Sequence, residues 1–295
     1  MDISLALGGG GARGHAHIGV IRRLEEEGFH IRAVAGTSAG GVIAALYASG
    51  YTSDQMEDLF AEMDQSKLFG RSGKDGPSIL GVSGATRILG EVLGERTFAD
   101  LQTPCALSAV DIKTAREVVL DEGPLVGAVL ATIAVPAILP PRLIGDYQLV
   151  DGAAMNPVPV SLARMLAPKL PVVAVVLSPR VGQENGFLPM RLPSRVPASF
   201  AEGFNRLRLA QALNVYIHSA DATDRMLTEL RLRFDNPEVV IRPEVGAIQI
   251  LDQVDVCKVV RLGEKATAAA LPELRRMASW PNRLRRRLFP RKQSL

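Results

Sequence analysis

The chain has 295 residues, of which 47% are hydrophobic and 22% charged, and its formal net charge is +3. This composition excludes a disordered or collagen-like chain, and the length suits one large α/β domain or two small ones. The two cysteines, Cys105 and Cys257, lie far apart in the sequence. They exclude a disulfide scaffold and a cysteine-based metal site, and we expect both to be reduced core residues.

The N-terminal stretch predicts a strand that runs into a glycine-rich turn. Met1 leads directly into the apolar run Ile3–Leu7 without a basic leader, which predicts a cytoplasmic protein. Four glycines follow from Gly8 to Gly11, and then an amphipathic helix. Because glycine amides are not screened by side chains, successive N–H groups here can converge on one anionic oxygen.

The spacing Gly9-x-Gly11-x-x-Gly14 also matches a dinucleotide-binding loop. That reading requires an acid at the end of the second strand, where this chain has Gly36-Thr37-Ser38. An oxyanion hole made by Gly9, Gly10 and Gly11 is the better interpretation. Two roles are open for Arg13: it adds positive charge to the site, or it braces the loop through a salt bridge.

The second glycine-rich turn contains a serine between two glycines. The apolar run 31–35 predicts a strand, the run 42–48 predicts a helix, and Gly36-Thr37-Ser38-Ala39-Gly40 joins them. This is the G-x-S-x-G pattern, in which a strained backbone exposes the serine hydroxyl at the start of a helix. We therefore expect Ser38 to be a nucleophile, with Gly36 and Gly40 allowing the strand and helix to approach closely.

The middle of the chain predicts two further strands, a loop and a buried helix. We expect strands at 105–110 and 116–120, and a lid-like loop at 66–83, which is rich in glycine. The apolar run 125–141 is broken only by Thr132 and ends in two prolines. It reads as a buried helix followed by a proline corner, because a membrane span would be longer and free of proline.

Asp151 is the strongest candidate for a catalytic acid or base. It follows the apolar strand 147–150 and precedes Gly152 and Ala153, two small residues that permit close approach to another loop. Asp111 also follows a strand, and Asp146 lies nearby, so both compete with it. We expect Asp111 to order its own loop through an Asx-turn.

The histidines do not fit the order of a Ser…Asp…His triad, in which a histidine follows a late strand. The chain contains His15, His17, His30 and His218. His15 and His17 are near the glycine loop, so a catalytic part is weighed against a structural role at the start of the helix.

The C-terminal part predicts a central apolar strand at 172–177, a helical stretch at 200–234 and a last helix at 251–271. Residues 271–295 contain eight Lys or Arg and one acid, with Trp280 and Phe289 among them. Such a mixture suits an anionic membrane surface, and a solvated terminus is the alternative. Nucleic acid is not expected as a partner, because no recognisable nucleic-acid-binding module accompanies the basic residues.

Three motifs together resemble the patatin-like phospholipase family: Gly9-Gly10-Gly11-Ala12-Arg13-Gly14, Gly36-Thr37-Ser38-Ala39-Gly40 and Asp151-Gly152-Ala153. The stretch Val240-Ile241-Arg242-Pro243-Glu244 is similar to the short bacterial members and to the catalytic domain of neuropathy target esterase. The resemblance extends from Ile3 to about Leu271. It implies a catalytic domain at 1–271 and a basic tail at 272–295.

The resemblance implies a three-layer α/β/α sandwich with a mostly parallel sheet and the hydrolysis of lipid acyl esters. It makes Ser38 the nucleophile, Asp151 the base and Gly9, Gly10 and Gly11 the oxyanion hole. The supporting motif residues are Arg13, Gly14, Gly36, Gly40 and Gly152. No metal or cofactor is implied. Phospholipid or lysophospholipid is the expected substrate, with peripheral attachment to a membrane. A lipid-binding protein of low turnover and an acyltransferase are the alternatives.

Overall fold

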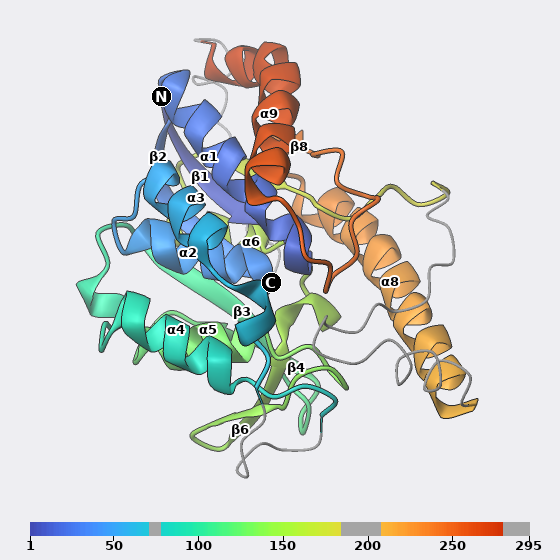
Figure 1. Cartoon of the computed structure of the whole chain (residues 1–295). Coiled ribbons are helices and arrows are strands. Elements are labelled where there is room, and N and C mark those ends of the chain that lie inside the picture. The colour runs from blue at the N-terminus through green and yellow to red at the C-terminus, as the bar shows by residue number, and fades with distance from the viewer. Residues whose placement is uncertain (71–77, 184–207, 280–295) are drawn as a thin grey trace.

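The computed structural model describes residues 1–70, 78–183 and 208–279. Within them, an eight-stranded sheet lies between two layers of helices (Figure 1). The expected α/β/α sandwich with a mostly parallel sheet is therefore confirmed.

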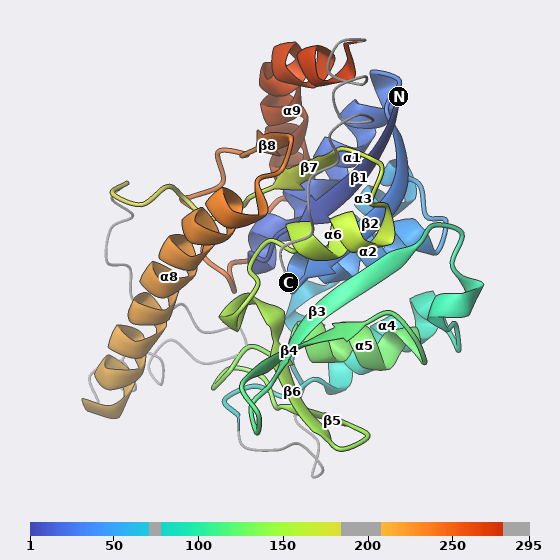
Figure 2. The same cartoon turned by 180° about the vertical axis from the view of Figure 1, so that it is seen from behind.

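The strands are β1 (Asp2–Leu7), β2 (His30–Thr37), β3 (Cys105–Asp111), β4 (Arg116–Leu120), β5 (Arg142–Ile144), β6 (Tyr147–Asp151), β7 (Val172–Val175) and β8 (Val239–Ile241). Their order is β5-β6-β3-β2-β1-β7-β8, and β4 pairs with β3. Pairing is parallel from β3 to β8 and antiparallel among β3, β4, β5 and β6. Figure 2 shows these antiparallel strands gathered at one end of the sheet.

The prediction that the strand at 172–177 is central is wrong. β7 lies beside the outermost strand β8, whereas β2 and β1 occupy the middle of the sheet. All residues of β7 are buried because helices cover both faces of the sheet. The apolar composition of a strand therefore indicates that both of its faces are buried, but not where the strand lies in the order of the sheet.

The helices are α1 (Ala16–Glu26), α2 (Ala39–Ala48), α3 (Ser53–Glu62), α4 (Ser83–Leu93), α5 (Leu125–Thr132), α6 (Val160–Leu166), α8 (Arg208–Asp235) and α9 (Val256–Ala278). α1, α2 and α9 lie on one side of the sheet in Figure 1, and α6 covers the other side in Figure 2. α8 extends away from the body beside the sheet.

Residue size along β1 explains why the two layers differ. Ile3, Leu5 and Leu7 belong to the large core shared with α1, α2 and α9. Ala6 belongs to the smaller core, where it meets alanines of neighbouring strands and the side chains of α6. The small residues let α6 approach the sheet closely, and the Ser4 hydroxyl donates to the Ala163 carbonyl of α6 at 2.7 Å.

One edge of β3 brings two strand ends together. Ser108 of β3 pairs with Thr37 of β2, and the next residue, Ala109, pairs with Asp151 of β6. β4 pairs with residues 107–111 of β3 along its other edge, so β2 and β6 lie on the same edge of β3. The ends of β2 and β6 therefore meet, and each is followed by a turn that carries a candidate catalytic residue.

The C-terminal helix is longer than predicted. α9 continues past the expected end at Leu271 to Ala278 and includes Pro272. The expected boundary between a domain at 1–271 and a tail at 272–295 thus falls inside this helix. Leu274 and Met277 of α9 are buried in the main core. Residues 280–295 of the basic tail, residues 71–77 of the expected lid, and residues 200–207 of the expected helix lie outside the described residues.

Two further expectations concern the burial of the two cysteines and the presence of membrane-spanning helices. Cys105 is buried as expected, but Cys257 is exposed on α9, so its assignment to the core is wrong. Among the residues that the structure describes, no helix combines the length and apolar character needed to span a membrane.

Candidate active site

Ser38 lies at a strained turn between β2 and α2. Its φ of 55° and ψ of −127° fall outside the regions that residues with a Cβ normally adopt, as expected for this pattern. The side chain is buried. Its amide donates to the Thr132 hydroxyl at 3.0 Å, and that hydroxyl donates to the Ser108 carbonyl at 2.6 Å. Thr132, the one polar residue in the apolar run 125–141, thus fixes the backbone of Ser38 against β3.

The motif glycines mark points where backbones approach too closely for a side chain. A Cβ on Gly40 would collide with the Leu7 carbonyl oxygen, and a Cβ on Gly152 would collide with the Ser108 carbonyl oxygen. Gly36 and Gly14 are similarly tight against the first turn of α2. These glycines join the ends of β1, β2, β3 and β6 into one compact edge.

The glycine loop leads from β1 into the 3-10 turn η1 (Gly11–His15) beside Ser38. A Cβ on Gly9 would lie 3.2 Å from the Cβ of Ser38. The Gly9 amide donates to the Pro157 carbonyl at 2.9 Å, so it is already satisfied. Within the described part of the chain, the amides of Gly10 and Gly11 donate to no acceptor. Among the described residues, the loop therefore presents the amides of Gly10 and Gly11 without a protein acceptor.

Arg13 braces the loop through a hydrogen bond to the backbone. Its Nε donates to the Ile248 carbonyl at 2.6 Å, and the neighbouring Ala12 amide donates to the Ile250 carbonyl at 2.9 Å. No carboxylate of the described residues pairs with it, so the brace is a hydrogen bond to the backbone and not the salt bridge considered as one of the two roles. Burial lowers the pKa of Arg13, and the charge of Asp221 opposes this effect. The loop is thus tied to the segment that precedes α9.

Asp151 lies at the end of β6 with its carboxylate inside the protein. Its Oδ1 accepts from the Ala153 amide at 2.9 Å, while Oδ2 is buried with no hydrogen-bond partner among the described residues. Burial raises the pKa of Asp151 to about 6, and the nearby Ser38 hydroxyl opposes the rise. The two side chains are close enough to interact in this way, although no hydrogen bond of normal geometry joins them.

The competing acids and histidines are engaged elsewhere. Asp111 accepts from the Thr114 hydroxyl and from the amides of Lys113 and Gln148, which is the expected Asx-turn. These donors lower its pKa. Asp146 is exposed in the turn between β5 and β6. His30 lies exposed at the start of β2, and His218 lies on α8.

His15 and His17 both bind backbone carbonyls of the glycine loop. His15 Nδ1 donates to the Ala12 carbonyl at 2.9 Å, and His17 Nε2 donates to the Gly8 carbonyl at 2.8 Å. Burial lowers the pKa of His17 to about 4, so this ring is neutral at ordinary pH. Neither ring forms a hydrogen bond to Ser38 or Asp151. Both histidines therefore hold the backbone of the glycine loop.

A polar network that sequence reasoning missed holds the turn after Asp151. Glu117 of β4 accepts from Ser108 Oγ at 2.8 Å and from Asn156 Nδ2 at 2.7 Å. Arg231 of α8 lies 3.7 Å from Glu117 and donates to the Met155 carbonyl at 3.1 Å. The only available signal was a glutamate, Glu117, directly before the apolar residues Val118–Leu120.

α8 also brings acidic residues close to the site. Burial raises the pKa of Asp224 to about 7, and the charges of Asp221 and Asp151 raise it further. Asp221 forms an ion pair with Arg225 one turn away. Asp151 therefore has a second carboxyl group nearby, on the side of the site that faces α8.

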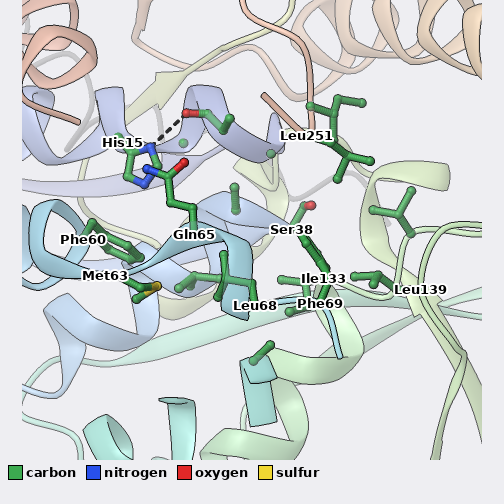
Figure 3. A pocket seen from close by; sticks show the side chains of 18 of the residues that line it. His15, Ser38, Phe60, Met63, Gln65, Leu68, Phe69, Ile133, Leu139 and Leu251 are labelled. Atoms are coloured by element: carbon green, nitrogen blue, oxygen red, sulfur yellow. Dashed lines mark hydrogen bonds between the residues drawn. The ribbon is translucent and has the colours of Figure 1, made fainter. Parts of the chain in front are cut away.

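Ser38 also lines a cavity of about 230 Å³ (Figure 3). Its walls come from η1, α2, α3 and α4, from residues 133–139 that follow α5 and from the segment before α9, and they are mainly apolar. The larger lining side chains are Val42, Phe60, Met63, Leu68, Phe69, Leu89, Ile133, Leu139 and Leu251. His15 meets Phe60 edge-on with ring centroids 5.0 Å apart. Such a lining suits an apolar part of a ligand.

Fold and site together define an α/β protein with a strained serine at a strand-to-helix turn, the arrangement of serine-dependent hydrolases. Residues 5–164 match the family model for patatin-like phospholipase. Since this match covers more than half of the chain, the chain belongs to the patatin-like phospholipase family.

Relatives place it within the family. An uncharacterized NTE family protein of Mycobacterium bovis is 33% identical over 54% of this chain, which spans 44% of that protein. Lysophospholipase NTE1 of Pyricularia oryzae is 26% identical over the whole chain, which corresponds to 20% of its length. The crystal structure of VipD from Legionella pneumophila shares the fold, with a TM-score of 0.54 and 12% identity over 92% of this chain and 66% of that one. The chain thus spans less than half the length of these curated relatives.

Proposed function

We propose that this protein hydrolyses lipid acyl esters through a Ser38–Asp151 dyad. The observation that carries the proposal is the position of Ser38: a strained, buried serine lines an apolar cavity and lies close to the Asp151 carboxylate, whose Oδ2 has no partner among the described residues. An ester carbonyl at Ser38 would have its acyl chain in the cavity and its alcohol part on the side of Asp151 and α8.

Each group has a defined step in the proposed reaction. Asp151 accepts the hydroxyl proton of Ser38 as the serine oxygen attacks the ester carbon. The amides of Gly10 and Gly11 donate to the carbonyl oxygen as it becomes negatively charged. The C–O bond to the alcohol then breaks, and the alcohol leaves with the proton from Asp151. Water repeats the sequence on the acyl-serine and releases the fatty acid.

The environment of Asp151 makes it a useful base without histidine. An exposed aspartate has a pKa of about 4 and holds a proton too weakly to assist a serine. Burial raises the pKa of Asp151 to about 6, which is closer to neutral. The single hydrogen bond from Ala153 fixes Oδ1 and leaves Oδ2 available.

Phospholipid or lysophospholipid is the proposed substrate class. The apolar cavity accounts for a long acyl chain, and the relative named lysophospholipase supports a glycerophospholipid. The proposal includes attachment to a membrane surface, since such substrates reside in membranes or micelles.

The test uses the full chain with Ser38→Ala and Asp151→Asn, and Asp58→Asn, an exposed substitution on α3, as the matched control. Each protein is incubated with phospholipids and lysophospholipids, and free fatty acid is measured by mass spectrometry. We expect release by the wild type and by the control, and none by the two site variants. Release by purified Ser38→Ala would refute the dyad. Lipid binding without fatty acid release by the wild type would favour a lipid-binding protein.

A further inference from the structure

Two hairpin turns lie side by side at the active-site end of the sheet. The first joins β3 to β4 at residues 112–115, and the second joins β5 to β6 at residues 145–146. Lys113 Nζ donates to the Asp146 carbonyl at 2.8 Å, and the Ile112 amide donates to the Gln148 carbonyl at 3.0 Å. These contacts hold the two turns together. We call the two turns and the strand residues next to them, 112–116 and 142–147, the hairpin tips.

The hairpin tips project beyond the site. β3 runs parallel to β2, and its residue Ser108 pairs with Thr37, the last residue before Ser38. β3 then continues to Asp111 before it turns. At about 3.3 Å per residue, the turn lies roughly 10 Å past the end of β2. A flat surface that touches the tips would therefore face the end of the sheet that carries Ser38.

Large apolar side chains are exposed on the hairpin tips. Leu143 is 74% exposed, and Ile112 and Tyr147 are each 48% exposed. Scattered exposed apolar residues are normal, but three on the ends of two adjacent hairpins form a local apolar projection. Tyr147 also has a polar end, which suits a position at the boundary between water and lipid.

The charges around these side chains are mainly positive. Lys113 and Arg116 are exposed, and Arg142 is partly exposed beside Leu143. Asp146 is the exposed carboxylate on the tips, because the carboxylate of Asp111 is buried and used by its own turn. Within the described part of the chain, Arg116 and Arg142 form no ion pair. A surface that complements the tips therefore combines negative charge with an apolar layer into which the exposed side chains can insert.

We propose that the hairpin tips dock this protein on an anionic membrane surface, with Ile112, Leu143 and Tyr147 entering the lipid boundary and Lys113, Arg116 and Arg142 contacting lipid phosphates. An anionic bilayer offers both features at once, whereas a protein partner would need a matching pocket. The purpose of docking, delivery of a lipid ester to Ser38, rests on the proposed function. The docking itself does not.

The binding test uses the full-length Ser38→Ala protein, so that vesicles stay intact. Flotation is measured with phosphatidylcholine vesicles that contain about one third phosphatidylserine. The double variant Ile112→Ser/Leu143→Ser is compared with Met165→Ser, which changes a 43% exposed side chain on α6 at the other face. We expect the double variant to lose about tenfold in partitioning and the control to be unchanged.

Charge-reversal variants test the electrostatic part of the proposal independently. Arg116→Glu/Arg142→Glu is compared with Lys265→Glu, whose exposed side chain lies on α9. The double reversal should weaken flotation about tenfold on anionic vesicles and have little effect on pure phosphatidylcholine. Equal flotation of wild type and both double variants would overturn the proposal. A change of oligomeric state in the apolar variant without lipid, with flotation intact, would assign the tips to contact between two copies of the chain and also overturn it.

Activity separates this proposal from the proposed function. In an otherwise wild-type chain, Ile112→Ser/Leu143→Ser should hydrolyse a short, water-soluble ester at the wild-type rate and lose most activity on vesicles. A wild type that hydrolyses neither substrate refutes the proposed function, while the flotation result on Ser38→Ala still decides the docking.

Discussion

Thr132 gives the sharpest test of how Ser38 is held. Its hydroxyl accepts from the Ser38 amide and donates to the Ser108 carbonyl, and all three groups are buried. Thr132→Val keeps the shape of the side chain and removes both bonds. Thr132→Ser keeps both bonds and removes the methyl group that lies beside Gly41.

The two variants should differ clearly in stability. Each buried polar group left without a partner costs about 1–3 kcal/mol, so Thr132→Val should lose about 2–6 kcal/mol. At about 2–4 °C per kcal/mol for a chain of this size class, the thermal midpoint falls by roughly 4–24 °C. Thr132→Ser loses one buried methyl, about 1 kcal/mol, and its midpoint should fall by only a few degrees.

Activity should follow the same order. Without its partner, the amide of Ser38 no longer holds the strained turn, and misplacement of a reacting group by about 1 Å can cost up to about 100-fold in rate. We expect kcat/KM for a soluble ester to fall at least about tenfold in Thr132→Val and by much less in Thr132→Ser. Circular dichroism melting and steady-state kinetics measure the two effects. Equal midpoints and equal kcat/KM values for the two variants would refute the reasoning.

Three further predictions follow from burial, close backbone contact and helix length. Burial raises the pKa of Asp151 to about 6, so the stability contributed by this group is present below about pH 4 and lost as pH rises through 6. Chemical unfolding at pH 8 should therefore show that Asp151→Asn is more stable than the wild type by about 3 kcal/mol. The kcat/KM of the wild type should rise with pH around 6, as Asp151 loses its proton. A Cβ fits at exposed Gly90 of α4 but not at Gly40, so melting should show Gly90→Ala stabilised by about 0.5–1 kcal/mol and Gly40→Ala strongly destabilised; equal midpoints would contradict this. Deleting 272–295 removes Leu274 and Met277, which are buried in the main core, so the truncated protein should show a lowered thermal midpoint in melting experiments.

Local sequence signals predicted the parts of the site that depend on short segments. The turn around Ser38 could be predicted because a strand, a glycine-flanked serine and a helix follow one another directly. Asp151 could be singled out because a strand ends there and small residues follow. Both predictions concern backbone geometry within a few residues, which depends mainly on the identity of neighbouring residues.

Features that depend on distant partners could not be predicted. The Gly9 amide is used by Pro157, whose position in the sequence gives no hint of the contact. Glu117 and Arg231 meet only because α8 crosses the turn after Asp151. Pro272 locally favours a helix end near Leu271, whereas α9 continues beyond it because Leu274 and Met277 are buried in the main core.

The most direct test of the central claim is covalent labelling of the nucleophile. The full-length wild type, Ser38→Ala and Asp151→Asn are incubated with a fluorophosphonate, and the modified peptide is identified by mass spectrometry. The proposed mechanism predicts a single adduct on Ser38 in the wild type, none in Ser38→Ala and much slower labelling in Asp151→Asn. An adduct on another residue, or equal labelling of Ser38→Ala, would contradict it.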